Sequence, residues 1–246
     1  MKVSVCFKIV PDYDQVPKDE WKGGLSLPDF RYVKKIIGVF DEGALETALC
    51  LKDVLPDTVL EAVSVGRPNS IFTESIYAAG FDKVTYLKNA GSEFDPSNTA
   101  RVLLEYFKSS DTDLILCGEQ VGPADSGTVP YFLASLMNIP VVDRVSELYV
   151  SGGKVMIKRE TDDSTQSFLC DRRMLAVVSS AAKPYLRFAE YSKKVEAGRK
   201  KADVRHIVTF PQFSHAVFRK KKAVKKNTVF LKSASEIRDL ISGGGI

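Results

Sequence analysis

Short apolar runs alternate with longer amphipathic segments over the first two-thirds of the chain. The apolar runs are typical of strands that are covered on both faces. Strands predicted in this way span 3–10, 58–66, 83–87 and 113–118. The segments between them repeat apolar residues every three or four positions, which predicts helices over 41–55, 71–80, 95–110 and 126–138. This alternation predicts an α/β fold, an open parallel sheet with helices on both faces.

Residues at the helix ends support these boundaries. Asp41 is a candidate N-cap for the first helix, and Pro96 with Ser97 is a typical helix start. Gly80 stands where a helix commonly ends in a left-handed residue.

The pattern changes at about residue 141. Shorter alternating segments follow, which predict a β-rich extension that pairs partly in antiparallel fashion with the parallel core; they span 141–150, 154–160, 164–170 and 174–180. We therefore assign 1–180 to a core with this extension, and 181–246 to an irregular, basic arm that ends in a short helix at 233–241. The arm has too few apolar residues for a core of its own, so we expect it to lie over the main domain or over a partner.

Composition narrows the class of protein. The net charge is only +4, from 35 Lys and Arg against 31 Asp and Glu, which is no nucleic-acid signature by itself. No apolar stretch approaches the roughly 20 residues of a membrane span, so no membrane insertion is expected. The first residues, MKVSVCFKIV, lack the features of a secretory signal, and we expect a cytoplasmic protein.

Cysteine and histidine usage argues against several kinds of site. The cysteines Cys6, Cys50, Cys117 and Cys170 form no CxxC pair and lie among apolar neighbours, so we expect reduced core residues. Only His206 and a second histidine at 215 are present, both in the basic arm. A zinc site, a Ser-His-Asp triad and a hydrolase are therefore not expected, and no metal site is assigned.

Three predicted strand ends lie where an open parallel sheet binds ligands. They are the turn at 10–13, the turn at 64–66 and the small-residue loop at 118–128. The third leads into a helix whose first turn is predicted to be Ser126, Gly127 and Thr128, where free N–H groups and the helix dipole favour a phosphate. A capped helix with a packing glycine fits the same residues, and Asp125 suits either a ribose contact or the N-cap. Neither GxGxxG nor a Walker A loop is present.

Five ordered motifs over residues 1 to about 200 resemble the β subunit of electron transfer flavoproteins, the FixA group. They are FKIVPDYD, FDEGALETALCLKD, VSVGRP followed by AAGFDKVTYL, LILCGEQVGPADSGTVP, and KRETDD followed by MLAVVSS. The resemblance implies an adenine-nucleotide α-hydrolase-like fold and a heterodimer with an α subunit that carries most of the FAD. It also implies a second nucleotide on this chain, which is AMP in ordinary carriers and a second FAD in electron-bifurcating members.

The resemblance also implies which residues form the nucleotide site. Carried over by motif, they are Cys6, Val10, Pro11, Asp12, Val65, Gly66, Gly118, Gln120, Val121, Gly122, Asp125, Ser126, Gly127, Thr128 and Val129, with Tyr13 as the aromatic near the flavin of the α subunit. The motifs depart from the family at two places. Gly38 and Val39 replace an Asn-Pro pair, while Thr128 and Pro130 replace a Gln and a Gly. AMP and FAD therefore both stay open.

A partner-docking segment is implied at 186–201. Arg187 and Phe188 align with the family's Arg-Tyr pair, and Tyr191 aligns with an anchor Leu. An aromatic surrounded by charge suits an interface, and a packed loop residue is the alternative. The basic run at 219–227 has little aromatic interleaving, so a solvated or partner-facing surface is favoured over nucleic acid.

The resulting expectation is an electron-carrier subunit with no catalytic residues of its own, which works with a flavin dehydrogenase of the acyl-CoA type. An electron-bifurcating β subunit and a nucleotide-binding module without a redox role are the alternatives. The dehydrogenase, the acceptor and the flavin potentials are left open.

Overall fold

The computed structural model describes residues 1–17, 30–89, 95–120, 126–209 and 233. Within these residues the strands of the main sheet are β1 (Lys2–Cys6), β4 (Val59–Val65), β5 (Lys83–Lys88), β6 (Leu114–Gly118), β7 (Val141–Ser151), β8 (Lys154–Glu160), β9 (Thr165–Leu169), β10 (Met174–Val178) and β11 (Asp203–His206). The helices are α1 (Val39–Val54), α2 (Ser70–Ala79), α3 (Pro96–Lys108), α4 (Val129–Met137) and α5 (Tyr191–Ala197). No helix of the described part is long and apolar enough to cross a membrane.

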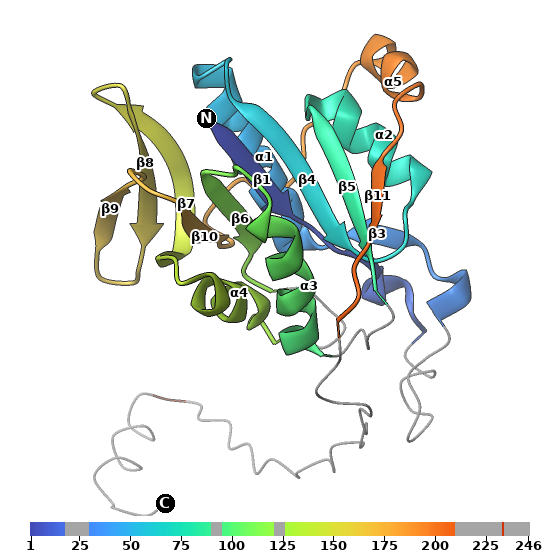
Figure 1. Cartoon of the computed structure of the whole chain (residues 1–246), viewed down its shortest axis with the longest axis horizontal. Helices are drawn as coiled ribbons and strands as arrows, with labels where there is room; N and C mark the ends of the chain where they lie inside the picture. Colours follow the sequence, from blue (N-terminus) through green and yellow to red (C-terminus); the bar gives the residue numbers. More distant parts are fainter. Residues whose placement is uncertain (18–29, 90–94, 121–125, 210–232, 234–246) are drawn as a thin grey trace, which may run out of the picture.

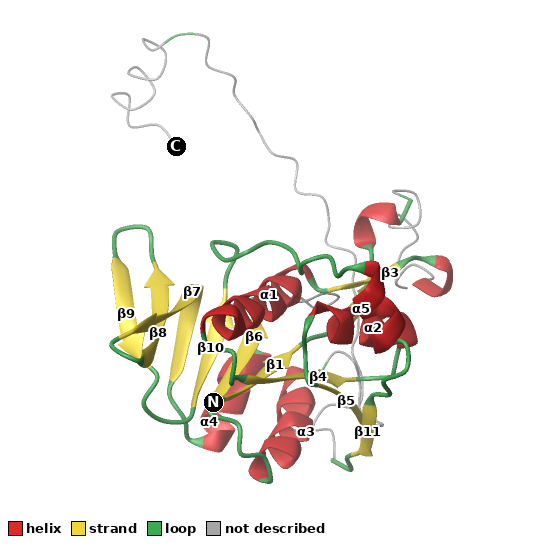
Figure 2. Cartoon of the chain, turned by 90° about the horizontal axis from the view of Figure 1, so that it is seen from above, coloured by secondary structure: helices red, strands yellow, loops and turns green. Residues whose placement is uncertain are grey.

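The main sheet is mostly parallel and has helices on both faces. In the described residues its strand order is β11-β5-β4-β1-β6-β10-β7-β8-β9, and only the pairs β7–β8 and β8–β9 are antiparallel (Figure 1). One face is covered by α1, α2 and α5, and the other by α3 and α4 (Figure 2). The predicted α/β fold class is therefore confirmed.

Strand β6 shows why the sequence builds this arrangement. Leu114 and Leu116 are buried in the cluster under α1, whereas Ile115 and Cys117 are buried in the cluster under α3 and α4. Successive side chains of a strand point to opposite faces, so a continuous apolar run supplies both layers. The run from Leu114 to Cys117 thus predicts a strand that is covered on both sides.

The predicted strand over 3–10 is two strands. After β1 the chain leaves the main sheet and forms β2 (Ile9–Pro11), which pairs antiparallel with β3 (Lys35–Ile37). The break lies at Lys8, whose N–H donates to the Asp41 carboxylate at 2.8 Å and whose C=O accepts from the N–H of Gly38 at 2.9 Å. The backbone of Lys8 is therefore bonded to the start of α1 instead of to a neighbouring strand.

Two predicted helix starts are also wrong. Helix α1 begins at Val39 with Gly38 as its N-cap, so Asp41 is the third residue of the helix and not its cap. Helix α4 begins at Val129 with Thr128 as its N-cap, so Ser126 and Gly127 precede the helix. The predicted boundaries of α2 and α3 agree with the structure to within two residues, including Gly80 at φ +123° after α2.

The chain beyond residue 141 contributes to the sheet twice. Strands β7, β8 and β9 form the predicted antiparallel extension, but β10 returns to the core and lies parallel between β6 and β7. The segment 181–209, expected to be irregular, contains α5 and the edge strand β11, which pairs parallel with β5. The basic run at 219–227 lies outside the described residues, as does all of the predicted helix at 233–241 except its first residue.

Edge strand β11 is attached by polar contacts. Lys83 on β5 bridges Asp203 of β11 at 3.4 Å and the buried carboxylate of Glu61 at 3.1 Å. Glu61 also accepts hydrogen bonds from the hydroxyls of Thr85, at 2.9 Å, and Tyr106. These partners explain how a carboxylate with only 1% of its side chain exposed is tolerated between β1 and β5.

Candidate functional site

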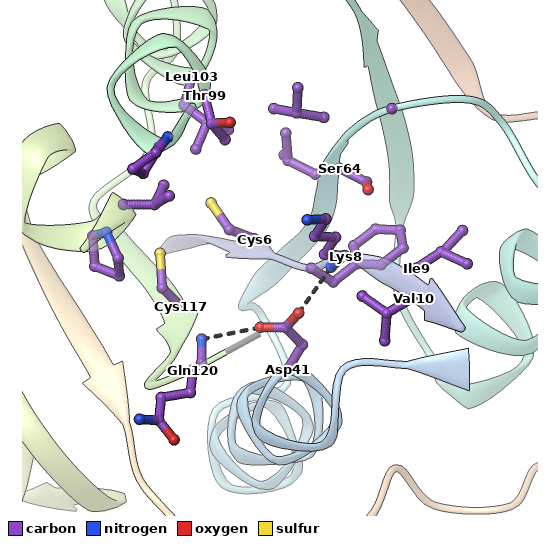
Figure 3. A pocket seen from close by; sticks show the side chains of 18 of the residues that line it. Cys6, Lys8, Ile9, Val10, Asp41, Ser64, Thr99, Leu103, Cys117 and Gln120 are labelled. Atoms are coloured by element: carbon purple, nitrogen blue, oxygen red, sulfur yellow. Dashed lines mark hydrogen bonds between the residues drawn. The ribbon is translucent and has the colours of Figure 1, made fainter. Parts of the chain in front are cut away.

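The carboxyl ends of β1, β4, β5 and β6 surround a cavity of about 1030 Å³ (Figure 3). Strand β1 is followed by α1 on one face, and β6 is followed by α4 on the other. The connections therefore diverge between two adjacent strands, which is where open α/β sheets bind ligands. The volume lies at the upper end of the range for small-molecule sites.

Most of the residues expected in the site line this cavity. They are Cys6, Val10, Pro11, Tyr13, Val65, Gly66, Gly118, Gln120, Ser126, Gly127, Thr128 and Val129. Asp12 is not among the lining residues; its carboxylate accepts a hydrogen bond from Gln15 at 2.7 Å, and its N–H donates to the C=O of Lys34. Val121, Gly122 and Asp125 lie outside the described residues.

Asp41 joins the two central strands at the base of the cavity. Its carboxylate accepts the N–H of Lys8, just past β1, at 2.8 Å and the N–H of Gly118, at the end of β6, at 3.3 Å (Figure 3). Burial raises the pKa of Asp41 to about 7, although these two N–H groups and the charge of Lys8 act in the opposite direction. Gly118 permits this approach, since a Cβ there would stand 2.5 Å from the Asp41 carboxylate.

The charged residues around the cavity are mainly cations. Among the described lining residues they are Lys8, Lys35, Arg67 and Lys88, against the carboxyl groups of Asp41 and Glu119. The pKa of one of these two groups, Asp41, is raised to about 7, so this carboxyl group carries only part of a negative charge near neutral pH. The balance favours an anionic ligand.

The loop before α4 supplies further groups that suit a phosphate. Thr128 makes no side-chain capping bond to α4 among the described residues, and the hydroxyls of Ser126 and Thr128 lie 3.0 Å apart on the cavity wall. Gly127 has φ +61°, and a Cβ there would meet the C=O of Glu119 at 2.8 Å. Only glycine therefore fits without strain at this turn. A helix does follow this loop, as predicted, but α4 begins at Val129, about one turn later than expected. The hydroxyl groups of Ser126 and Thr128 therefore stand before the helix and not in its first turn.

A polar cluster at the end of β5 was missed in the sequence. The Asn89 amide donates to Thr209 Oγ1 at 2.9 Å and accepts from the Asn98 amide at 3.0 Å, and Thr209 in turn donates to Asn98 Oδ1 at 2.6 Å. Asn89 and Asn98 line the cavity. The same strand-end argument, applied to the strand over 83–87, would have found Asn89.

Two cysteine side chains lie in the floor of the cavity. Cys6 on β1 is half-buried, and Cys117 on β6 is buried beside it (Figure 3). Of the four cysteines expected in the core, only Cys117 is buried; Cys6, Cys50 and Cys170 are partly exposed, and Cys6 faces the cavity.

The three predicted docking residues differ in their surroundings. Arg187 donates to the carboxylates of Glu46, at 2.8 Å, and Asp53, at 2.7 Å, and these bonds raise its pKa. Phe188 and Tyr191 are 98% and 82% exposed. The arginine thus attaches the segment to α1, while the two aromatic rings face solvent.

The arrangement can bind an anionic ligand with an apolar part, and we find no cluster of His, Cys, Asp and Glu suited to a metal in the described residues. The cations, the hydroxyls and the start of α4 suit phosphate groups, and Val10, Pro11 and Val65 supply an apolar wall.

A family model described as the electron transfer flavoprotein domain matches residues 31–208, more than two-thirds of the chain. With the sheet order and the position of the cavity, this match shows that the chain belongs to the electron transfer flavoprotein family.

Proposed function

We propose that this chain is the β subunit of a heterodimeric electron transfer flavoprotein and that it binds an adenine nucleotide in the cavity at the strand ends. The observation that carries the proposal is the cation-lined cavity between β1 and β6, with the start of α4 on its wall. Phosphates bind at helix starts because backbone N–H groups and the helix dipole both favour negative charge.

The residues that would hold the nucleotide divide into two groups. Ser126, Gly127 and Thr128 suit the phosphate, and Val10 and Val65 offer apolar contact for a base. AMP is the ordinary occupant we propose. The cavity volume of about 1030 Å³ also allows a second FAD, as in an electron-bifurcating subunit.

Electron transfer in this proposal uses a flavin shared with an α subunit, which supplies the redox chemistry when it is bound. This chain contributes binding and orientation, and we assign it no catalytic residue. Its partners are the α subunit and a flavin dehydrogenase such as an acyl-CoA dehydrogenase, and we place the complex in the cytoplasm.

Exposed apolar side chains support partner binding. Phe188 and Tyr191 suit the dehydrogenase, because large rings surrounded by charge are common interface anchors. Tyr131, Phe132 and Leu136 on α4 are each more than 40% exposed and suit the α subunit.

The first experiment is to co-express the chain with its α subunit and to measure FAD and AMP per purified heterodimer. One FAD and one AMP would support the ordinary carrier, and two FAD would support the bifurcating form. A heterodimer without flavin that cannot be reduced would refute the electron-carrier proposal and leave a nucleotide-binding module.

A charge reversal tests the cavity itself. Lys88→Glu places a carboxylate in the cavity wall, and we expect AMP affinity to fall by about tenfold or more, equivalent to 1.4 kcal/mol. Lys154→Glu, at the exposed start of β8, is the matched control and should leave the affinity unchanged. Calorimetric titration of nucleotide-stripped heterodimer measures both, and equal affinities would place the nucleotide elsewhere.

A further inference from the structure

Cys6 and Cys117 occupy neighbouring positions on adjacent parallel strands. The register of β1 and β6 pairs Val5 with Leu116, so each cysteine is the next residue along its strand. Neighbouring strands are roughly 4.7–4.9 Å apart. Both side chains pack in the apolar cluster under α3 and α4, so they share one face of the sheet.

The two side chains are close enough for Cys6 to raise the pKa of the Cys117 thiol. A disulfide requires Cα atoms roughly 4.4–6.8 Å apart and side chains that point toward one another, and the strand spacing falls inside that range. The pair also lies in the cavity wall, where a small solute can enter.

We propose that Cys6 and Cys117 are a vicinal dithiol that closes to a disulfide when a small-molecule disulfide, such as glutathione disulfide, enters the cavity. The proposal goes beyond nucleotide binding and does not depend on it.

Closure to a disulfide takes two thiol–disulfide exchange steps, and the surroundings of the two thiols indicate which of them reacts first. Contact with Cys6, burial and the charge of Asp41 raise the pKa of Cys117 well above its ordinary value. Cys6 is the more exposed thiol, so it reacts first. Its thiolate attacks one sulfur of the small disulfide, which forms a mixed disulfide and releases one small thiolate.

Cys117 then completes the exchange. It loses its proton and attacks the Cys6 sulfur, which forms the Cys6–Cys117 bond and expels the second small thiolate. The two protons from the protein thiols are taken up by the two released thiolates. The protein is oxidised by two electrons, and one small disulfide is reduced to two thiols.

The other cysteines are internal controls. Cys50 contacts Glu46 and Arg187, at 3.6 and 3.8 Å, and Cys170 contacts the C=O of Arg172 at 4.0 Å. Burial and the charge of Glu46 raise the pKa of Cys50, and burial raises that of Cys170 to about 11. Neither has a second thiol at hand for closure.

Peptide mapping of the full chain tests the proposal without any substitution. Trypsin places the four cysteines in separate peptides, spanning 3–8, 36–52, 109–144 and 160–172. After incubation with glutathione disulfide, we expect peptides 3–8 and 109–144 joined, with the loss of two hydrogen atoms. Because closure is intramolecular, this species should exceed adducts at the other cysteines by about tenfold or more. A lasting glutathione adduct on Cys6 with no joined peptide would overturn the proposal.

Three variants and a second reagent test the assigned order of reaction and the pairing of the two thiols. Cys117→Ser should trap the glutathione adduct on Cys6, and Cys6→Ser should form no adduct on Cys117. Phenylarsine oxide, which bridges two close thiols, should bind the wild-type chain and Cys50→Ser but neither of those variants. Binding that survives in both Cys6→Ser and Cys117→Ser, or a wild-type chain that binds none, would refute the dithiol.

Discussion

Replacing Asp41 by Asn tests how ionisation of the buried carboxyl group at the base of the cavity affects the free energy of unfolding. The side chain is 5% exposed and joins the N–H of Lys8 to that of Gly118. Asn has nearly the same shape and keeps one oxygen as acceptor, but it carries no charge at any pH. The substitution therefore isolates the ionisation of this one group.

The magnitude follows from the raised pKa. Burial raises the pKa of Asp41 from 3.8 to about 7, so between these values the folded protein holds a proton that the unfolded chain has released. The protonated Asp41 therefore stabilises the folded protein fully below pH 3.8. This contribution to the free energy of unfolding is lost as the pH rises to about 7. At 1.36 kcal/mol per tenfold change, the loss is about 4 kcal/mol.

The assay is the free energy of unfolding of both proteins, from urea titrations followed by circular dichroism at several pH values between about 4 and 8. Other titrating groups are common to both, so the difference between the two proteins reports Asp41. We expect Asp41→Asn to gain stability relative to wild type as the pH rises, by about 4 kcal/mol in all. A flat difference, or one of opposite sign, would show that the two N–H groups and the start of α1 keep Asp41 ionised, and the reasoning from burial would be refuted.

Three further predictions concern the packing of Gly118 against α1, the docking residues Arg187 and Phe188, and the access of a reagent to Cys6. Gly118→Ala forces a Cβ against the first turn of α1 and should cost about 1–3 kcal/mol in urea titrations, whereas an unchanged midpoint would contradict the close approach. Arg187→Ala leaves the 10%-exposed Glu46 without its guanidinium and should cost about 1–2 kcal/mol. Phe188→Ala, its exposed neighbour, should change stability by less than about 0.5 kcal/mol while weakening dehydrogenase binding, and equal losses of stability would disprove this division. AMP should slow alkylation of Cys6 by iodoacetamide several-fold if the nucleotide binds in the cavity, and an unchanged rate would argue against that site.

The strands and helices were predictable where local pattern and tertiary environment agree. The run from Leu114 to Cys117 is apolar because both faces are covered, and Gly80 ends α2 because its φ of +123° disfavours a side chain. The strand ends followed from the same pattern, since parallel strands place their carboxyl ends at one edge. Together with the family motifs, this placed most of the expected site residues correctly, but it did not find other lining residues such as Lys8, Lys35 and Lys88.

The misplaced boundaries have a common cause. The run over 3–10 reads as one strand, but the N–H of Lys8 is bonded to Asp41, a residue 33 positions away. Asp41 itself resembles an N-cap in sequence, because nothing local shows that its carboxylate reaches two other strand ends instead. Contacts between distant segments decided both positions.

By itself, the sequence determined the fold class, the strand ends at which a ligand would bind and the family to which the chain belongs. These rest on the period of apolar residues and on ordered motifs, which are local properties of the chain. Only the tertiary structure decided that β10 lies between β6 and β7, that β11 extends the edge at β5, and that Cys6 and Cys117 lie side by side. The physical reason is that strand order and side-chain pairs depend on which buried surfaces fit together, and residues far apart in sequence supply those surfaces.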